Sequence, residues 1–219
     1  SRSSGTGFFI RKPKYSVLKS LEGYPTVSQS DYENENAVYV LTCAHVVDGA
    51  ETIKIKMIPF GSDLHDCQLV SMIPCNLQEF NENFNTYYDI ALLRIQDPDN
   101  KFKNKVEYLD IRPSRTLVQG ETLVSYGFPL GVPQLMAVSG DFSGMSHLIQ
   151  HTVPINPGNS GGAIMDKNLN VVAMGNSGIR PDMANNVSYA IPIELFQNSQ
   201  QFMFSVPPGL KDERSVLRI

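Results

Sequence analysis

The stretch Thr52-Ile53-Lys54-Ile55-Lys56-Met57 alternates between apolar and charged or polar side chains. A period of two places the apolar side chains on one face and the lysines on the other, as in a strand half buried in a sheet. Similar short runs, rich in β-branched and aromatic residues and separated by turn-forming residues, lie on both sides of it. The predicted strands are Gly5–Ile10, Ala37–Val47, Thr52–Met57, Cys67–Ile73, Asp89–Ile95, Val106–Ile111, Thr122–Tyr126, Leu135–Ser139, His147–Val153, Gly162–Met165, Val171–Met174 and Val187–Ile191.

So many short strands indicate the all-β class, and twelve fit two packed six-stranded β-barrels better than one sheet. One short C-terminal helix is predicted to start near Pro192, a residue suited to a first helical turn, and to reach Phe202. We expect the domain to cover residues 1–205, with the two barrel halves meeting at about 112–120, and residues 206–219 to form a tail or linker. The stretch 76–88, with four asparagines, is predicted to be a surface loop.

The composition limits the partners that we expect. The chain of 219 residues is long enough to bury about 70% of its unfolded surface. Its 42% hydrophobic and 18% charged residues exclude an intrinsically disordered chain. The net charge of −4, without a basic stripe, argues against nucleic acid as a partner. No apolar run approaches the roughly 18 residues that would span a membrane, so no membrane partner is expected.

Cysteine usage bears on the cellular compartment. Cys43, Cys67 and Cys75 are an odd, small set, which does not suggest a secreted disulfide framework. Cys67 and Cys75 could pair across a loop, but free thiols are favoured. With no signal-peptide core near the start, this predicts an intracellular, cytoplasmic protein. No Cys-x-x-Cys pair is present, and we expect neither a metal nor a cofactor.

Three segments carry candidate chemistry: residues 41–47, which contain His45, residues 88–93, which contain Asp89, and residues 156–164, which contain Ser160. A serine hydroxyl is a weak nucleophile and needs a base, an imidazole can take and return its proton, and a buried carboxylate orients the imidazole. Each feature alone has an ordinary structural interpretation, as a strand-end histidine, a capping aspartate or a glycine turn. Their joint occurrence, each at the boundary of a β-rich run, favours a catalytic interpretation.

These segments resemble the chymotrypsin-like (trypsin-like) serine proteases, and most of all their HtrA/Deg branch. The opening run 4–10 and the closing run 187–193 are also similar to that branch, so the resemblance covers nearly all of residues 4–204. It implies a double β-barrel with the triad at the barrel interface, and peptide-bond hydrolysis through an acyl-enzyme. It also implies an oxyanion hole made by the backbone N–H groups of Gly158 and Ser160, together with Asn159. The expected partner is a polypeptide substrate, and domains outside this chain remain open.

The sequence also departs from the family pattern. Val46 stands where secreted relatives carry a disulfide cysteine, and uncharged Asn159 stands where zymogens carry an aspartate that pairs with a new N-terminus. Activation by N-terminal cleavage is therefore not expected. Only six residues separate Phe142 from Ile149, too few for the long regulatory loop of HtrA proteins. No PDZ domain is expected after residue 205.

The resemblance implies three walls for the pocket that receives the residue before the scissile bond. No acidic residue occurs in them, which predicts a preference for small to medium apolar side chains, although Asp141 or Asp182 could reach the pocket from a loop. The residues expected to bind substrate are Val153, Pro154, Ile155, Asn156, Met174, Gly175, Asn176, Ser177 and Ser188. Two alternatives stay open: a narrow-specificity processing protease module of a larger, viral or effector, protein, and an inactive peptide-binding pseudoprotease.

Overall fold

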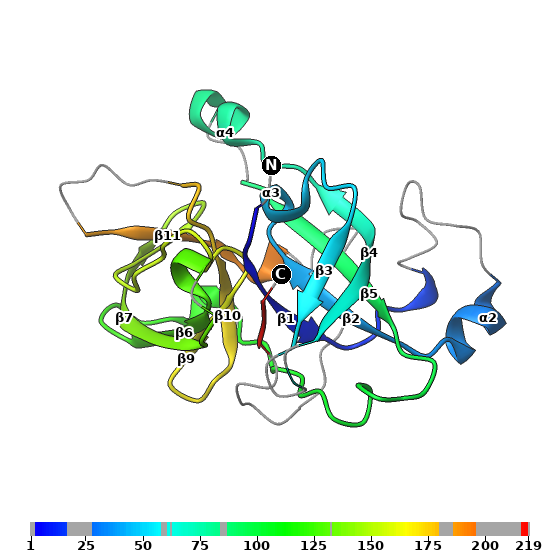
Figure 1. Ribbon diagram of the computed structural model, residues 1–219. Coiled ribbons are helices and arrows are strands. Elements are labelled where there is room, and N and C mark those ends of the chain that lie inside the picture. The colour runs from blue at the N-terminus through cyan, green and yellow to red at the C-terminus, as the bar shows by residue number, and fades with distance from the viewer. Residues whose placement is uncertain are drawn as a thin grey trace.

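The computed structural model describes residues 3–16, 28–57, 61, 63–83, 87–131, 133–179, 186–195 and 216–218. Its strands form two closed six-stranded antiparallel barrels that lie side by side (Figure 1). This confirms the predicted all-β class and the two-barrel architecture. Among the described residues, no helix has the length and apolar character required to cross a membrane.

The first barrel has the strand order β1-β12-β3-β4-β5-β2. Tyr39, Leu41 and Leu92 are among its fully buried residues, and their apolar faces explain why β2 and β5 pair along their length. The bounds of its strands are β1 Thr6–Ile10, β2 Ala37–Thr42, β3 Ile53–Lys56, β4 Leu64–Ile73, β5 Ile90–Gln96 and β12 Val216–Arg218.

The second barrel has the order β10-β11-β8-β7-β6-β9. Its own core is small, but Met174 and Ile191 join the core of the first barrel, so one apolar cluster continues across the boundary between the barrels. The bounds of its strands are β6 Thr122–Gly127, β7 Met136–Met145, β8 Ile149–His151, β9 Ala163–Asp166, β10 Val171–Gly175 and β11 Ser188–Pro192. The predicted division at about 112–120 falls between β5 and β6.

Short helices lie in the connections between strands. In Figure 1, α3 and α4 both lie at the top of the view, near the boundary between the barrels, whereas α2 lies at the far end of the first barrel. Their bounds are α2 Gln29–Asn34, α3 Ala44–Val47 and α4 Leu77–Asn83, with single 3-10 turns η2 at Ser114–Thr116 and η3 at Pro129–Gly131. The predicted C-terminal helix starts later than Pro192, which is the last residue of β11. Ile193 lies in a turn, Glu194 and Leu195 are helical, and residues 196–202 lie outside the described residues.

The first two differences from the sequence prediction concern strands. The run 106–111 is not a strand: Val106 closes a turn by donating to the Phe102 carbonyl, and only Ile111 forms a single bridge, to Val171. The sixth strand of the first barrel is instead β12, which lies in the segment expected to be a tail or linker. It pairs with β1 and β3 and so covers edges that would otherwise leave unpaired backbone groups.

The other differences are helical. The predicted strand 37–47 ends at Thr42, and α3 follows it directly. The predicted loop 76–88 contains α4, which is held where Phe80 packs edge-on against Tyr87, with ring centroids 5.7 Å apart.

His151 introduces a pH-sensitive group into the second barrel. Its ring is fully buried, and its Nδ1 accepts a hydrogen bond from the Val153 N–H. Its Nε2 makes no hydrogen bond with the described residues. Burial is the main cause that lowers the pKa of His151 from 6.5 to about 4, and the Tyr189 backbone opposes part of this effect. The neutral imidazole is therefore the form that suits the fold.

Because the folded protein binds this proton less readily than the unfolded chain, stability should fall as the pH drops from 6.5 towards 4. The loss from this group should total about 3 kcal/mol. Urea unfolding at several pH values measures it, and His151→Asn is the matched variant, because its side-chain oxygen can still accept from Val153 N–H but does not titrate. The variant should show a shallower pH dependence; equal slopes for the two proteins would contradict this prediction.

Candidate active site

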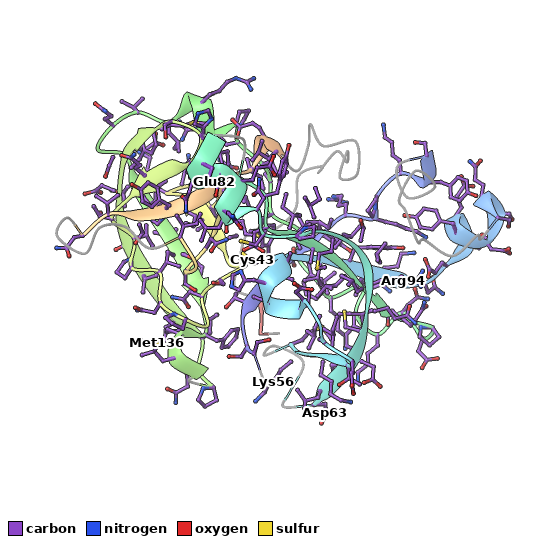
Figure 2. All side chains as sticks on the ribbon, turned by 90° about the horizontal axis from the view of Figure 1, so that it is seen from above. Cys43, Lys56, Asp63, Glu82, Arg94 and Met136 are labelled. Carbon is purple, nitrogen blue, oxygen red and sulfur yellow. The ribbon has the colours of Figure 1, made fainter. Side chains whose placement is uncertain are left out.

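The pairing of β2 with β5 brings His45 next to Asp89. Thr42, the last residue of β2, is paired with Ala91, near the start of β5. The chain therefore leaves the sheet at the same end of both strands, through residues 43–45 after β2 and residue 89 before β5. In Figure 2, Cys43 marks this end near the boundary between the barrels, with Met136 and Arg94 well away on either side.

The Asp89 carboxylate holds the His45 imidazole in a defined orientation. Asp89 is fully buried, and its Oδ2 lies 2.5 Å from His45 Nδ1. Its Oδ1 accepts the backbone N–H of His45 at 2.8 Å, which also fixes the first turn of α3. Because Nδ1 donates to the carboxylate, Nε2 of the neutral imidazole is the nitrogen able to accept a proton. The His45 side chain is 36% exposed, so the imidazole reaches the surface, unlike the buried carboxylate that holds it.

Behind Asp89 lies a buried polar chain that the sequence motifs did not indicate. Asn176 Nδ2 donates to Asp89 Oδ2 at 2.6 Å and to the Tyr87 hydroxyl at 3.3 Å. The Tyr87 hydroxyl in turn lies 3.2 Å from the Cys75 thiol. Asn176 was predicted to bind substrate; the structure places its amide against the carboxylate instead. No sequence motif marks Tyr87 for this position, except that it lies two residues before Asp89.

Cys43 completes a group of three metal-ligand types, since its thiol lies within 4.8 Å of the His45 and Asp89 ligand atoms. The group is already hydrogen-bonded internally: the Cys43 thiol donates to the Gly175 carbonyl, and Asp89 accepts three hydrogen bonds. Burial raises the pKa of the Cys43 thiol well above its usual value. The arrangement fits a packed protein site better than an ion site. All three cysteines are free thiols.

Ser160 lies on the glycine-rich turn that precedes β9. Gly161 has φ +87°, and a Cβ there would lie 2.2 Å from the Thr6 carbonyl oxygen, so this position requires glycine. The Ser160 hydroxyl lies 2.6 Å from the Ser177 hydroxyl and accepts the Ser177 N–H at 3.0 Å. Among the described residues it makes no hydrogen bond to His45. The Ser160 hydroxyl must therefore exchange Ser177 for His45 as its partner before His45 can take its proton.

The turn also presents two backbone donors. Within the described part of the chain, the N–H groups of Gly158 and Ser160 have no acceptor. Asn159 differs, because its N–H donates to the Asn156 carbonyl at 2.9 Å and is already used. Two unpaired N–H groups that flank one turn are the arrangement that stabilises a developing oxyanion.

The predicted pocket residues divide into buried and accessible groups. Val153 and Met174 are fully buried in the barrel cores, so they do not offer an apolar lining to a substrate. Gly175, on β10, is also buried. The residues that stay exposed or partly exposed are Pro154, Ile155, Asn156, Ser177 and Ser188. Asp141 is exposed on β7, whereas Asp182 lies outside the described residues.

The comparison with known families agrees with this geometry. The family model of the trypsin-like peptidase domain matches residues 23–174, which include His45, Asp89 and Ser160. The chain belongs to the trypsin-like peptidases. The match confirms the family that the sequence resemblance predicted.

Relatives of this trypsin-like peptidase are proteases of the HtrA/Deg type. It is 29% identical over 179 residues to the putative serine protease HhoB of Synechocystis, and 30% identical over 171 residues to the periplasmic serine endoprotease DegP of Salmonella typhimurium. These matches cover 76% and 73% of the chain but only 38% and 32% of the relatives, so the chain spans about a third of their length. The solved HtrA-type protease AlgW with a decapeptide superposes with a TM-score of 0.54 at 25% identity, over 72% of this chain and 45% of that one.

Proposed function

We propose that this trypsin-like peptidase is a serine endopeptidase with Ser160 as nucleophile, His45 as general acid and base, and Asp89 as the group that orients the imidazole. The observation that carries the proposal is the pairing of His45 Nδ1 with the buried Asp89 carboxylate, which leaves Nε2 as the proton acceptor. The unpaired N–H groups of Gly158 and Ser160 support it, because they supply a site for the negative charge.

In the proposed reaction, the Ser160 hydroxyl first leaves Ser177 and donates its proton to His45 Nε2 as its oxygen attacks the peptide carbonyl carbon. The carbonyl oxygen becomes an oxyanion, which accepts from the two backbone N–H groups. His45 then gives its proton to the amine as the C–N bond breaks, leaving an acyl-enzyme on Ser160. Water attacks this ester with His45 again as base, and the carboxylic acid product and the serine hydroxyl are released.

A second function, peptide binding without catalysis, is favoured by one observation: the Ser160 hydroxyl is bonded to Ser177 and not to His45. A fluorophosphonate probe separates the two functions, since it forms a covalent bond only with an activated serine. Labelling of the wild type that is lost in both Ser160→Ala and His45→Ala supports the endopeptidase. No labelling of the folded wild-type protein would favour peptide binding alone.

Two roles are open to a serine endopeptidase, broad degradation and narrow processing, and they differ in substrate range. Cleavage of a peptide library by this protein separates them. Cleavage of many unrelated sequences fits broad degradation, and one strict motif fits a processing role. The substrate, which we propose to be a polypeptide, would bind in an extended conformation.

The residues expected to form the specificity pocket predict a preference for small to medium apolar residues before the scissile bond. None of its described exposed residues, which are Pro154, Ile155, Asn156, Ser177 and Ser188, carries a negative charge to pair with Lys or Arg. A buried ammonium without a counter-charge would lose its hydration at a cost of several kcal/mol. In a matched set of peptides that differ only at this position, Val, Ala, Leu and Met should therefore give kcat/KM at least about 10-fold above Lys.

The opposite outcome would make the pocket assignment wrong. If Lys or Arg peptides gave the highest kcat/KM, Asp141→Asn and Asp182→Asn would identify which carboxylate supplies the missing charge.

A further inference from the structure

Thr6 lies under the candidate oxyanion turn although it is distant from it in the sequence. It is the first residue of β1 and is fully buried. Its packing is close: a Cβ at Gly162 would lie 3.3 Å from its methyl group, and one at Gly127 would lie 3.1 Å from its hydroxyl. The first barrel therefore contributes this residue to a turn that belongs to the second.

Thr6 makes two hydrogen bonds to carbonyl groups of the turn. Its N–H donates to the Ser160 carbonyl at 2.9 Å, and its hydroxyl donates to the Gly158 carbonyl at 2.7 Å. The same hydroxyl accepts the Phe128 N–H at 3.2 Å, which fixes the direction in which it donates. With its N–H and its hydroxyl both donating to the turn, Thr6 ties residues 158 and 160 directly to β1.

These bonds complete a set that holds each peptide plane of the turn. The Gly158–Asn159 peptide is held by the Thr6 hydroxyl at its carbonyl and by Asn156 at its N–H. The Ser160–Gly161 peptide is held by the Thr6 N–H at its carbonyl and by Gly175 at its N–H.

The two peptides that carry the free N–H groups are held only through their carbonyls. The Pro157 carbonyl accepts from Leu130 N–H at 2.6 Å, and the Asn159 carbonyl accepts from Gly162 N–H at 3.0 Å. Their N–H groups, those of Gly158 and Ser160, have no acceptor in the described residues. The planes that Thr6 holds lie directly after each of these donors.

Side-chain charge does not hold this turn. The buried Asn159 side chain is neutral, and its Oδ1 has no hydrogen-bond partner among the described residues. Leu130 adopts φ +53°, an unfavourable conformation for leucine, and still donates to Pro157. Among the described residues, the backbone of the turn is thus held by backbone groups and by one side-chain hydroxyl, that of Thr6.

We propose that Thr6 is a positioning residue that presets the oxyanion hole, by fixing the carbonyls of Gly158 and Ser160 so that their N–H groups point to the reacting carbonyl. The inference rests on the proposed function. It predicts that loss of the hydroxyl weakens transition-state stabilisation and leaves substrate binding unchanged, because misplaced donors matter only once charge has developed on the oxygen.

The test compares Thr6→Ser, which keeps the hydroxyl, with Thr6→Ala, which differs from it only by that group. Relative to Thr6→Ser, kcat of Thr6→Ala should fall about 10- to 100-fold with KM little changed. The Ki of a peptide aldehyde, whose adduct with Ser160 places an oxyanion in the hole, should rise by a similar factor. In the Ser160→Ala background, the two Thr6 variants should bind the uncleaved substrate peptide with equal Kd.

Ser125→Ala is the control for the loss of a buried hydroxyl, since Ser125 also donates to a backbone carbonyl, that of Ala163. It should lower Tm without the fall in kcat. Each rate is divided by the concentration of active sites, which complete labelling with the fluorophosphonate measures, so that unfolded protein is not counted.

The outcomes separate the two proposals. An active wild type in which Thr6→Ala and Thr6→Ser have equal kcat and equal aldehyde Ki would overturn the role of Thr6 alone. A folded wild type that neither labels nor cleaves any peptide would overturn the proposed function, and the role of Thr6 with it.

Discussion

Replacing Ser160 with alanine is expected to lower kcat for peptide hydrolysis by about 10⁴-fold or more, because attack then falls to water without an enzyme nucleophile. His45→Ala should cost a similar factor, since the serine then has no base. The Ser160→Ala/His45→Ala double variant should be little worse than either single variant, because the two residues act as one unit. Rates are measured on a peptide found in the library screen.

The fold should survive the Ser160 substitution. The hydroxyl is bonded only to Ser177 among the described residues, and Ser177 is partly exposed, so water can replace the lost partner. An unchanged circular dichroism spectrum and Tm are the control. Full peptidase activity in purified Ser160→Ala would contradict the assignment of the nucleophile, and a double variant with multiplied losses would contradict a serine–histidine unit.

Gly161→Ala should destabilise the protein by about 4 kcal/mol or more, enough to prevent folding in many domains of this size. The new Cβ would lie 2.2 Å from the Thr6 carbonyl oxygen and 2.2 Å from Thr42 Oγ1, and at least the first of these is backbone that cannot move without disturbing β1. The φ of +87° adds a smaller conformational penalty. Urea unfolding, or the yield of soluble protein if none refolds, measures the effect.

Gly120→Ala is the matched control, because Gly120 has nearly the same φ, +83°, but a Cβ there would meet nothing within 4 Å. It should cost only about 1–2 kcal/mol. Equal losses at the two glycines would mean that backbone conformation, and not the close approach of β1 to the turn, sets the requirement for glycine at position 161.

The fold was predictable where local patterning and burial agree. The alternation at residues 52–57 identified β3, and the long apolar run from Ala37 identified β2, since both are signals within one strand. The run 106–111 gave a false signal because its β-forming residues are held by a turn at Phe102. The strand β12 was missed because three residues pair only after β1 and β3 have placed their edges beside them.

The candidate site was likewise predictable only in part. His45, Asp89 and Ser160 stand in distinctive local motifs, which made them visible in the sequence. Thr6 and the carboxylate-bound Asn176 act through partners 152 and 87 residues away, and no local pattern reports such contacts. Val153 and Met174, which were expected to bind substrate, are instead buried in the barrel cores, because sequence alone does not show which strand face meets the core.

The hydrogen bonds of Thr6 also set an order of assembly during synthesis. Thr6 leaves the ribosome long before Gly158, its partner 152 residues later, and β1 gains its second neighbour only when Arg218 pairs with Thr6. Contacts between such distant residues form late, because the intervening chain must first be ordered. His45 and Asp89, both in the first barrel, can meet while the second barrel is still unfolded. The proposed nucleophile Ser160 and the proposed oxyanion donors cannot be held in place until both barrels have formed. If the proposed function holds, a nascent chain would therefore carry the base without a competent serine and would be unable to cut its neighbours.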